Sequence, residues 1–196
     1  MKRGFFNRIK ENYLNSFKFI KSSKNFIYLG VLIFVAFALF GFFVTLPDIL
    51  SIQILDYFKE LVEKTQNYNT WQMISFLFFN NLQASFLGMI LGVFIGIFPL
   101  INLFGNGFIL GFAAKLSVAQ EGFGSLWRIL PHGIFELPAI FIALGIGMKL
   151  GSFVSEKKKW KTLKIYFIES LKVFVLIVLP LLILAAIIEG LLIVLS

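Results

Sequence analysis

Five apolar runs constrain this chain more than any other feature of its sequence. A transmembrane helix needs about 20 predominantly apolar residues. Runs of roughly that length or more cover residues 25–46, 70–98, 100–119, 131–150 and 166–195. The chain is only 14% charged, whereas an ordinary soluble domain is about 25% charged. The sequence therefore predicts an all-α fold, a polytopic membrane helical bundle with five transmembrane spans.

The third run is the least regular of the five. Its beginning is interrupted by small and polar residues, namely Asn102, Gly105, Asn106 and Gly107. We expect these residues to break the helix, which leaves a regular segment of about 14 residues, or about 21 Å at 1.5 Å per residue. A full-length span and a re-entrant, half-length segment both remain open here.

Lys and Arg residues are distributed unevenly among the connections between the runs. Seven precede the first run and five more lie between the fourth and the fifth, whereas residues 48–69 carry four acidic residues against two lysines. Because positively charged connections stay in the cytoplasm, we predict a cell membrane protein with a cytoplasmic amino terminus and a carboxyl terminus outside. The net charge of +8 then belongs to the inner face, which argues against nucleic-acid binding.

Two further segments have the periodicity of amphipathic helices. In residues 1–24, apolar side chains recur at helical spacing among Lys and Arg, which is typical of a helix in the anionic inner interface. We separate this segment from a single membrane domain at residues 25–196. A stripe in the second connection predicts an outer amphipathic helix, and we expect it to pack against its own bundle. The stripe consists of Ile54, Leu55, Phe58, Leu61 and Val62.

Glycine recurs at every fourth position in three stretches of the apolar runs. These residues are Gly88, Gly92 and Gly96, then Gly107 and Gly111, then Gly147 and Gly151. Small residues at this spacing let two helices approach closely and pack by dispersion. We favour packing within the chain, although the same surface would suit a homodimer.

Polar and ionisable residues at membrane depth form a second set. The predicted topology places them in one outer half of the bilayer: Asn80, Asn81, Lys115, Arg128, His132, Glu136 and Glu189. Such groups are costly in hydrocarbon and face the interior of a bundle. They would suit a pocket for a cation, a proton or a polar head group, or equally a structural network that ties spans together. Within the set we expect Glu136 to pair with Lys115 or Arg128.

The common patterns of catalytic and metal sites are missing from the sequence. It contains no Cys and one His, which excludes a disulfide framework, a thiolate metal site and a cysteine nucleophile. His132 and Glu136 do not form an HExxH motif, and there is neither a GxSxG nor a Walker A motif. We therefore expect no catalytic residue, no metal and no cofactor.

The segment PHGIFELPA at residues 131–139 resembles the stage II sporulation protein M family of integral membrane proteins. The segment AAIIEG at residues 185–190 supports the resemblance, which covers about residues 70–195. The matching motif positions are Asn80, Asn106, Gly107, Gly111, Pro131, His132, Gly133, Glu136 and Glu189. The resemblance implies a multi-pass membrane scaffold, which in the sporulation member recruits peptidoglycan-degrading partners for septal thinning and engulfment.

Two functions from different classes follow. The first is a non-catalytic scaffold or subunit in the lipid bilayer that engages membrane-protein partners, with a homodimer as one form. The alternative is a small transporter or channel-like protein that moves an ion or a proton, or binds a lipid head group, through the outer polar set. Intramembrane hydrolysis would require a catalytic set that the sequence lacks.

Overall fold

The computed structural model describes residues 2–128 and 130–195, and within them the side chains of 2–6, 127–132, 135, 194 and 195 lie outside the description. The described chain is helical throughout its regular elements and has no strand. The long helices are α1 (Lys2–Ser22), α2 (Lys24–Phe43), α3 (Asp48–Thr65), α4 (Thr70–Ile90), α5 (Ile97–Glu121), α6 (Leu130–Gly151), α7 (Lys159–Val173) and α8 (Leu179–Leu195). Short turns of helix are η1 (Leu91–Val93), η2 (Phe123–Arg128), η3 (Ser152–Ser155) and the π-helical η4 (Phe174–Val178).

Five helical segments are long and apolar enough to cross a membrane. They cover Lys24–Phe43, Thr70–Val93, Ile97–Glu121, Glu136–Ser155 and Lys159–Ile193. The predicted all-α architecture with five spans is therefore confirmed.

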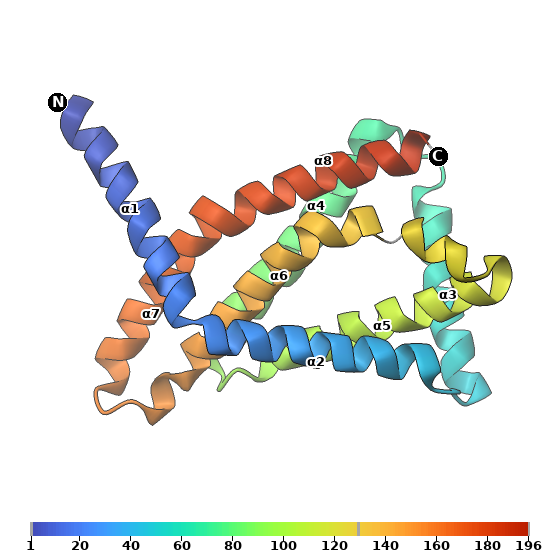
Figure 1. Ribbon diagram of the computed structural model, residues 1–196, viewed down its shortest axis with the longest axis horizontal. Helices are drawn as coiled ribbons and strands as arrows, with labels where there is room; N and C mark the ends of the chain where they lie inside the picture. Colours follow the sequence, from blue (N-terminus) through green and yellow to red (C-terminus); the bar gives the residue numbers. More distant parts are fainter. Residues whose placement is uncertain (1, 129, 196) are drawn as a thin grey trace.

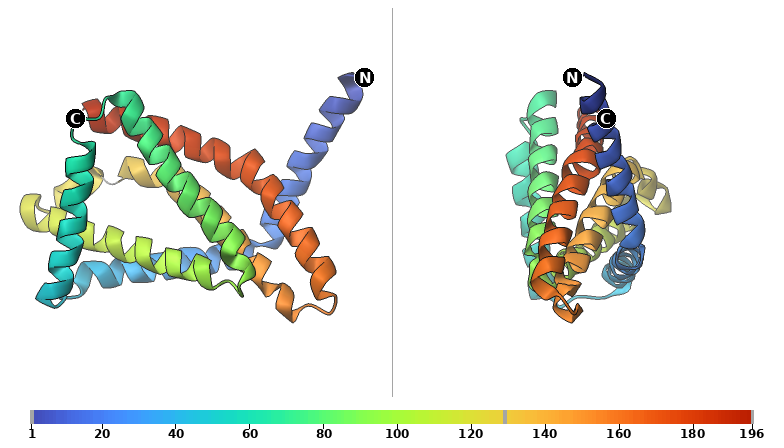
Figure 2. Two further views of the ribbon diagram at one scale, coloured as in Figure 1. Left: turned by 180° about the vertical axis from the view of Figure 1, so that it is seen from behind. Right: turned by 90° about the vertical axis from the view of Figure 1, so that its left-hand side faces the viewer.

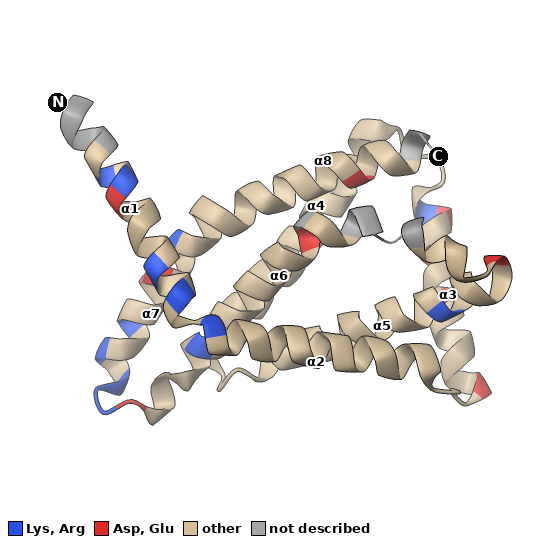
Figure 3. Ribbon diagram, in the orientation of Figure 1, with Lys and Arg blue, Asp and Glu red and all other residues tan. Residues whose placement is uncertain are grey.

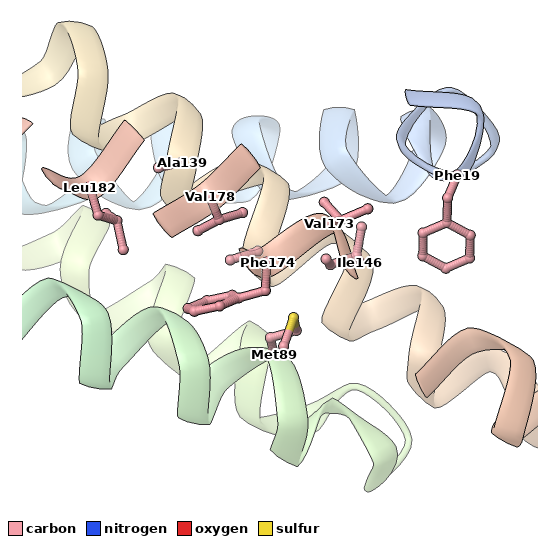
Figure 4. Packing of buried hydrophobic residues seen from close by; sticks show 9 residues of the cluster. Phe19, Met89, Ala139, Ile146, Val173, Phe174, Val178 and Leu182 are labelled. Carbon is pink, nitrogen blue, oxygen red and sulfur yellow. The ribbon is translucent and has the colours of Figure 1, made fainter. Parts of the chain in front are cut away.

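Helix α6 is the centre of the bundle. It packs against α4 and α8 on one side and against α2 and α5 on the other. Figure 1 shows α2 and α5 running side by side, with α6 between this pair and α8. The side chains of α6 enter both hydrophobic cores, since Ala143 and Ile146 contribute to one and Leu144 and Met148 to the other. Figure 4 shows the first core, in which α6 meets side chains of α4, α8 and the end of α1.

The two ends of the bundle differ in charge. We call one the basic end; it comprises residues 2–24, the connection at 91–97 and residues 149–172. Fourteen of the 18 Lys and Arg residues lie in its segments 2–24 and 149–172, with only three of the ten acidic residues. The other, the α3 end, comprises residues 44–70 and 115–136. Figures 2 and 3 show α1 and α3 at opposite ends, with the Lys and Arg residues gathered around α1 and α7.

Helix α5 corrects the expectation for the third span. It is continuous over 25 residues, so the predicted break and the half-length alternative are both wrong. The Asn106 side chain donates to the carbonyl and to Oδ1 of Asn102, both at 2.9 Å, so these amides bond along the helix instead of ending it. Gly107 is required by its neighbour α2, because a Cβ there would meet the backbone of Phe34.

Two other spans have bounds that differ from the sequence expectation. The helix of the second span ends at Val93 rather than near residue 98, because Ile95 (φ 57°) and Gly96 (φ 74°) turn the chain into α5. Gly96 therefore lies in a turn and not on the face of α4. The fifth span begins earlier than expected, at Lys159, and contains η4 just before Pro180, which has no N–H to donate to the preceding turn.

Helix α3 forms where the sequence predicts it, but it does not pack as expected. None of its residues is buried. Ile54, Phe58 and Leu61 are half-buried, whereas Ile49 and Val62 are 72% and 62% exposed. Short connections at both ends hold α3 across the end of the bundle (Figure 1), so its apolar stripe is only partly covered by this chain.

Candidate functional site

Three residues of the predicted polar set lie on helices that pack against one another. Asn81 on α4 and Glu136 on α6 are buried, with exposed fractions of 8% and 4%, and Glu189 on α8 is half-buried. Helices α4, α6 and α8 contact each other in all three pairs, and the acidic segments of α6 and α8 lie in the same half of the bundle (Figure 3). Buried or half-buried polar side chains therefore occur on all three helices of this junction.

Lys115 has a different neighbour from the one expected. Its Nζ donates to the carbonyl oxygen of Val44 at 2.7 Å, at the carboxyl end of α2. Lysine side chains stabilise helix ends in this way by satisfying carbonyls that lack an intrahelical donor. Among the described residues Lys115 therefore bonds to the end of α2, and the predicted pairing of Glu136 stays a prediction.

Other predicted residues are placed by their backbone alone or elsewhere in the fold. The side chains of Arg128, Pro131 and His132 lie outside the described residues, and so does the predicted pair between Glu136 and Arg128. Gly133 lies in the first turns of α6, where a Cβ would meet only the Leu137 side chain, at 3.3 Å. Asn80 is exposed and donates to Asn81 at 3.4 Å.

The predicted packing glycines make their close approaches within the chain. A Cβ at Gly92 would overlap the Gly147 carbonyl, and one at Gly151 would overlap the backbone of the connection between α4 and α5. Gly147 lies against Met89 of α4 in the same interface, and a Cβ at Gly88 would overlap the Leu144 side chain. Gly107 and Gly111 instead bring α5 onto the backbone of α2, while Gly96 lies over Met148. These glycines thus join α4 to α6 and α5 to α2.

Three more glycines with the same role were not singled out by the sequence analysis. Cβ atoms at Gly41, Gly145 and Gly190 would overlap residues of α5, α2 and α4 respectively. The residues four positions before Gly41 and Gly145 are Phe37 and Phe141, which are large. The glycine spacing therefore did not indicate these two positions. Their role depends on which helix lies opposite.

A second polar site, at the basic end, was also missed. Lys149 is 7% exposed, and its Nζ donates to Oγ of Ser22 at 2.5 Å. The same ammonium lies 4.4 Å from the ring centre of Phe19 and 5.1 Å from that of Tyr166. The cation thereby links α6 to α1 and α7. A lysine at the end of an apolar run is usually interpreted as an anchor at the membrane interface. The sequence pattern therefore did not indicate that Lys149 is buried.

The exposed side of α4 carries a groove of about 650 Å³ near the α3 end. Its lining includes Lys64, Tyr68, Trp71, Phe76, Asn80 and Gln83. Lys64 lies over the Phe76 ring, 5.2 Å from its centre. Trp71 and Phe79 both line the groove, and 76% and 63% of their surface is exposed. This surface, from Lys64 to Gln83, is called the α4 face below.

No cluster of three or more potential metal ligands occurs among the described His, Asp and Glu residues. The polar groups of the described chain include the buried side chains of Asn81, Glu136 and Lys149, and the exposed amides of the α4 face. These groups suit binding and assembly.

Comparisons with known proteins agree with this architecture. Residues 30–192 match the family Stage II sporulation protein M. The "Uncharacterized protein MJ0706" of Methanocaldococcus jannaschii is 32% identical over 174 residues, which is 84% of this chain and 76% of that protein. No solved structure matches the chain. Since the family match covers most of the sequence, and five helices can span a membrane, the protein belongs to the stage II sporulation protein M family of multi-pass membrane proteins.

Proposed function

We propose that this protein is a non-catalytic membrane scaffold or subunit that binds other membrane proteins through the α4 face. The observation that carries the proposal is the exposure of amide side chains on a membrane-spanning helix. Asn80 and Gln83 are both exposed on α4, within the span Thr70–Val93.

The depth of these amides makes exposure to lipid costly. Gln83 lies 13 residues from Thr70, which corresponds to about 20 Å along the helix, near the middle of this 24-residue span. Within the described chain, no group hydrogen-bonds the Gln83 side chain. An amide in hydrocarbon is stabilised by a partner helix that returns its hydrogen bonds. A partner helix at the α4 face would therefore lower the free energy of the membrane-inserted protein by hydrogen-bonding the Gln83 amide.

The closed packing at the basic end supports a scaffold over a pore. The connection between α4 and α5 lies against the backbone of α6 at Gly147 and Gly151, and the neighbouring side chains of Met89 and Leu150 have no exposed surface. Dry backbone contact of this kind leaves little room for a hydrated path between these helices.

The test is partner capture from native membranes. Cells carrying the tagged protein are crosslinked, solubilised in mild detergent and analysed by mass spectrometry. We expect reproducible partners or a defined oligomer with the natural sequence, and a clear loss with the double variant Asn80→Leu, Gln83→Leu. Val175→Leu is the matched control, because Val175 is 57% exposed but lies on another helical segment and does not line the groove. A monomer without partners in native membranes would contradict the proposal.

A second candidate, transport, rests on Glu136. This carboxyl-bearing side chain is 4% exposed within α6, two residues before Pro138, which interrupts the hydrogen bonding of the helix. Transporters use acidic side chains inside membrane-spanning helices to bind ions or protons. The candidate predicts ion- or proton-dependent flux in proteoliposomes that disappears in Glu136→Gln or Glu189→Gln. Flux that both variants retain would remove this polar set as the route.

A further inference from the structure

The α4 face combines a hollow and a projecting rim on one surface. The exposed rings of Trp71 and Phe79 are among the residues that line the groove of about 650 Å³, so they form part of its rim. Two-fold symmetric dimers need one surface that carries both the projecting and the receiving shape, because each copy meets an identical patch. The shape of the α4 face fulfils this condition with residues of α4, of the turn before it and of the end of α3.

We infer that the α4 face binds a second copy of this chain, in a parallel dimer whose two-fold axis runs along the membrane normal. The inference rests on the proposed function, because it names the occupant of the same surface. In such a dimer the aromatic rings of each copy fill the groove of the other, and α4 packs beside α4.

The amides of the α4 face fit this occupant. A two-fold axis along the membrane normal brings each residue to the same depth as its symmetry mate, so Gln83 meets Gln83 and Asn80 lies near Asn80. A carboxamide carries both donors and an acceptor, so two identical amides satisfy each other. A different helix would need its own polar side chains at these two depths.

The charge of the α4 face also permits two identical copies to meet. Lys64 is the single ionisable Lys, Arg, Asp or Glu among the groove-lining residues, and it lies at the end of α3, away from Gln83. Its ammonium is already held over the Phe76 ring. The centre of the surface is thus uncharged, and no like charges oppose each other at membrane depth.

The natural sequence contains no cysteine, which allows a direct test by disulfide crosslinking. Phe79→Cys and Gln83→Cys are oxidised in native membranes, beside Leu32→Cys and Val175→Cys as controls, which are similarly exposed on other helices at 65% and 57%. We expect a species of twice the chain mass from positions 79 and 83, and none from the controls.

Each other outcome overturns the inference. A crosslinked product of different mass would identify another protein as the occupant, which would leave the proposed scaffold function intact. No product from positions 79 and 83, or a dimer that forms equally from all four positions, would remove the α4 face as a specific dimer surface. Partner capture, measured separately with the natural sequence, decides the scaffold function itself.

A substitution without cysteine gives the quantitative version of the test. Gln83→Leu replaces the amide with an apolar side chain of similar size, so the pair of amides can no longer form. We expect the dissociation constant of the dimer in lipid bicelles, measured by energy transfer between labelled copies, to rise by about three- to thirty-fold, because interhelical amide bonds in membranes are modest. Leu32→Ala should leave the constant unchanged. A constant for Gln83→Leu within about twofold of the natural protein would contradict an amide-paired interface.

Discussion

The basic end of the bundle is closely packed, whereas much of the α3 end is exposed. At the basic end, helix backbones touch through Gly92, Gly147 and Gly151, and a buried ammonium at Lys149 joins three helices. At the α3 end, a whole helix has no buried residue, and on the adjoining α4 the amides of Asn80 and Gln83 are exposed. The first end is held by contacts inside the chain, whereas the second leaves polar and aromatic groups exposed.

The connection between α4 and α5 explains how both ends coexist. It holds the two helices together at the basic end, and from there they diverge toward the α3 end (Figure 2). The two helices therefore lie closest to each other near this connection. We expect substitutions at the basic end to act on folding, and substitutions at the α3 end to act on recognition.

The largest effect is expected from Gly92→Ala. Its Cβ would overlap the backbone carbonyl of Gly147, which cannot move without separating α4 from α6, so the free energy of unfolding should fall by about 1–3 kcal/mol. Thermal unfolding in mild detergent, followed by tryptophan fluorescence, measures it. Gly105→Ala is the matched control, because no atom lies within 4 Å of its Cβ position, and it should be neutral or slightly stabilising. Equal destabilisation by both would refute backbone packing as the cause.

Next in size is Lys149→Leu, which removes the hydrogen bond to Ser22 and both ring contacts. We expect a loss of about 1–2 kcal/mol in unfolding free energy, together with faster trypsin cleavage in α1, because α1 loses its link to α6. Lys172→Leu serves as control, since its pair with Glu169 is partly exposed and contributes little. Unchanged cleavage of α1 would show that Phe19 packing alone holds the helix.

A smaller effect is expected from Asn69→Ala at the α3 end. Asn69 Oδ1 accepts from the Gln72 backbone N–H at 3.0 Å, and Gln72 Oε1 accepts from the Asn69 N–H at 2.9 Å. Loss of this capping box should cost about 1 kcal/mol, measured by thermal unfolding. Gln53→Ala, exposed on α3, should change stability by less. A loss larger than that of Gly92→Ala would reverse the ranking of the two ends.

The smallest effect belongs to Lys59→Ala on α3. Lys59 and Asp56 form an ion pair at 3.5 Å with side chains that are 72% and 63% exposed, so its removal should cost less than about 0.5 kcal/mol. A double-mutant cycle with Asp56→Ala isolates the pair. A coupling above 1 kcal/mol would mean that α3 is shielded from water by a neighbour.

The spans could be predicted from the sequence because length and apolar composition alone decide whether a helix can cross a membrane. The course of α5 could not, since Gly107 and Asn106 are helix breakers in isolation and acquire their roles only beside α2 and Asn102. The same holds for Lys115 and Lys149, whose partners lie 71 and 127 residues away in the sequence. Neighbours distant in the sequence decided the roles of Gly107, Lys115 and Lys149, whereas the bond from Asn106 to Asn102 lies within α5.

The length of the last helical segment has a consequence for its place in the membrane. From Lys159 to Ile193 it runs for 35 residues, or about 52 Å, whereas the hydrocarbon core of a bilayer is about 30 Å thick. The segment therefore fits a bilayer only when it is tilted or when part of it lies outside the hydrocarbon. Because α1 packs against its first part at Tyr166, the tilt of the fifth span and the position of α1 depend on each other.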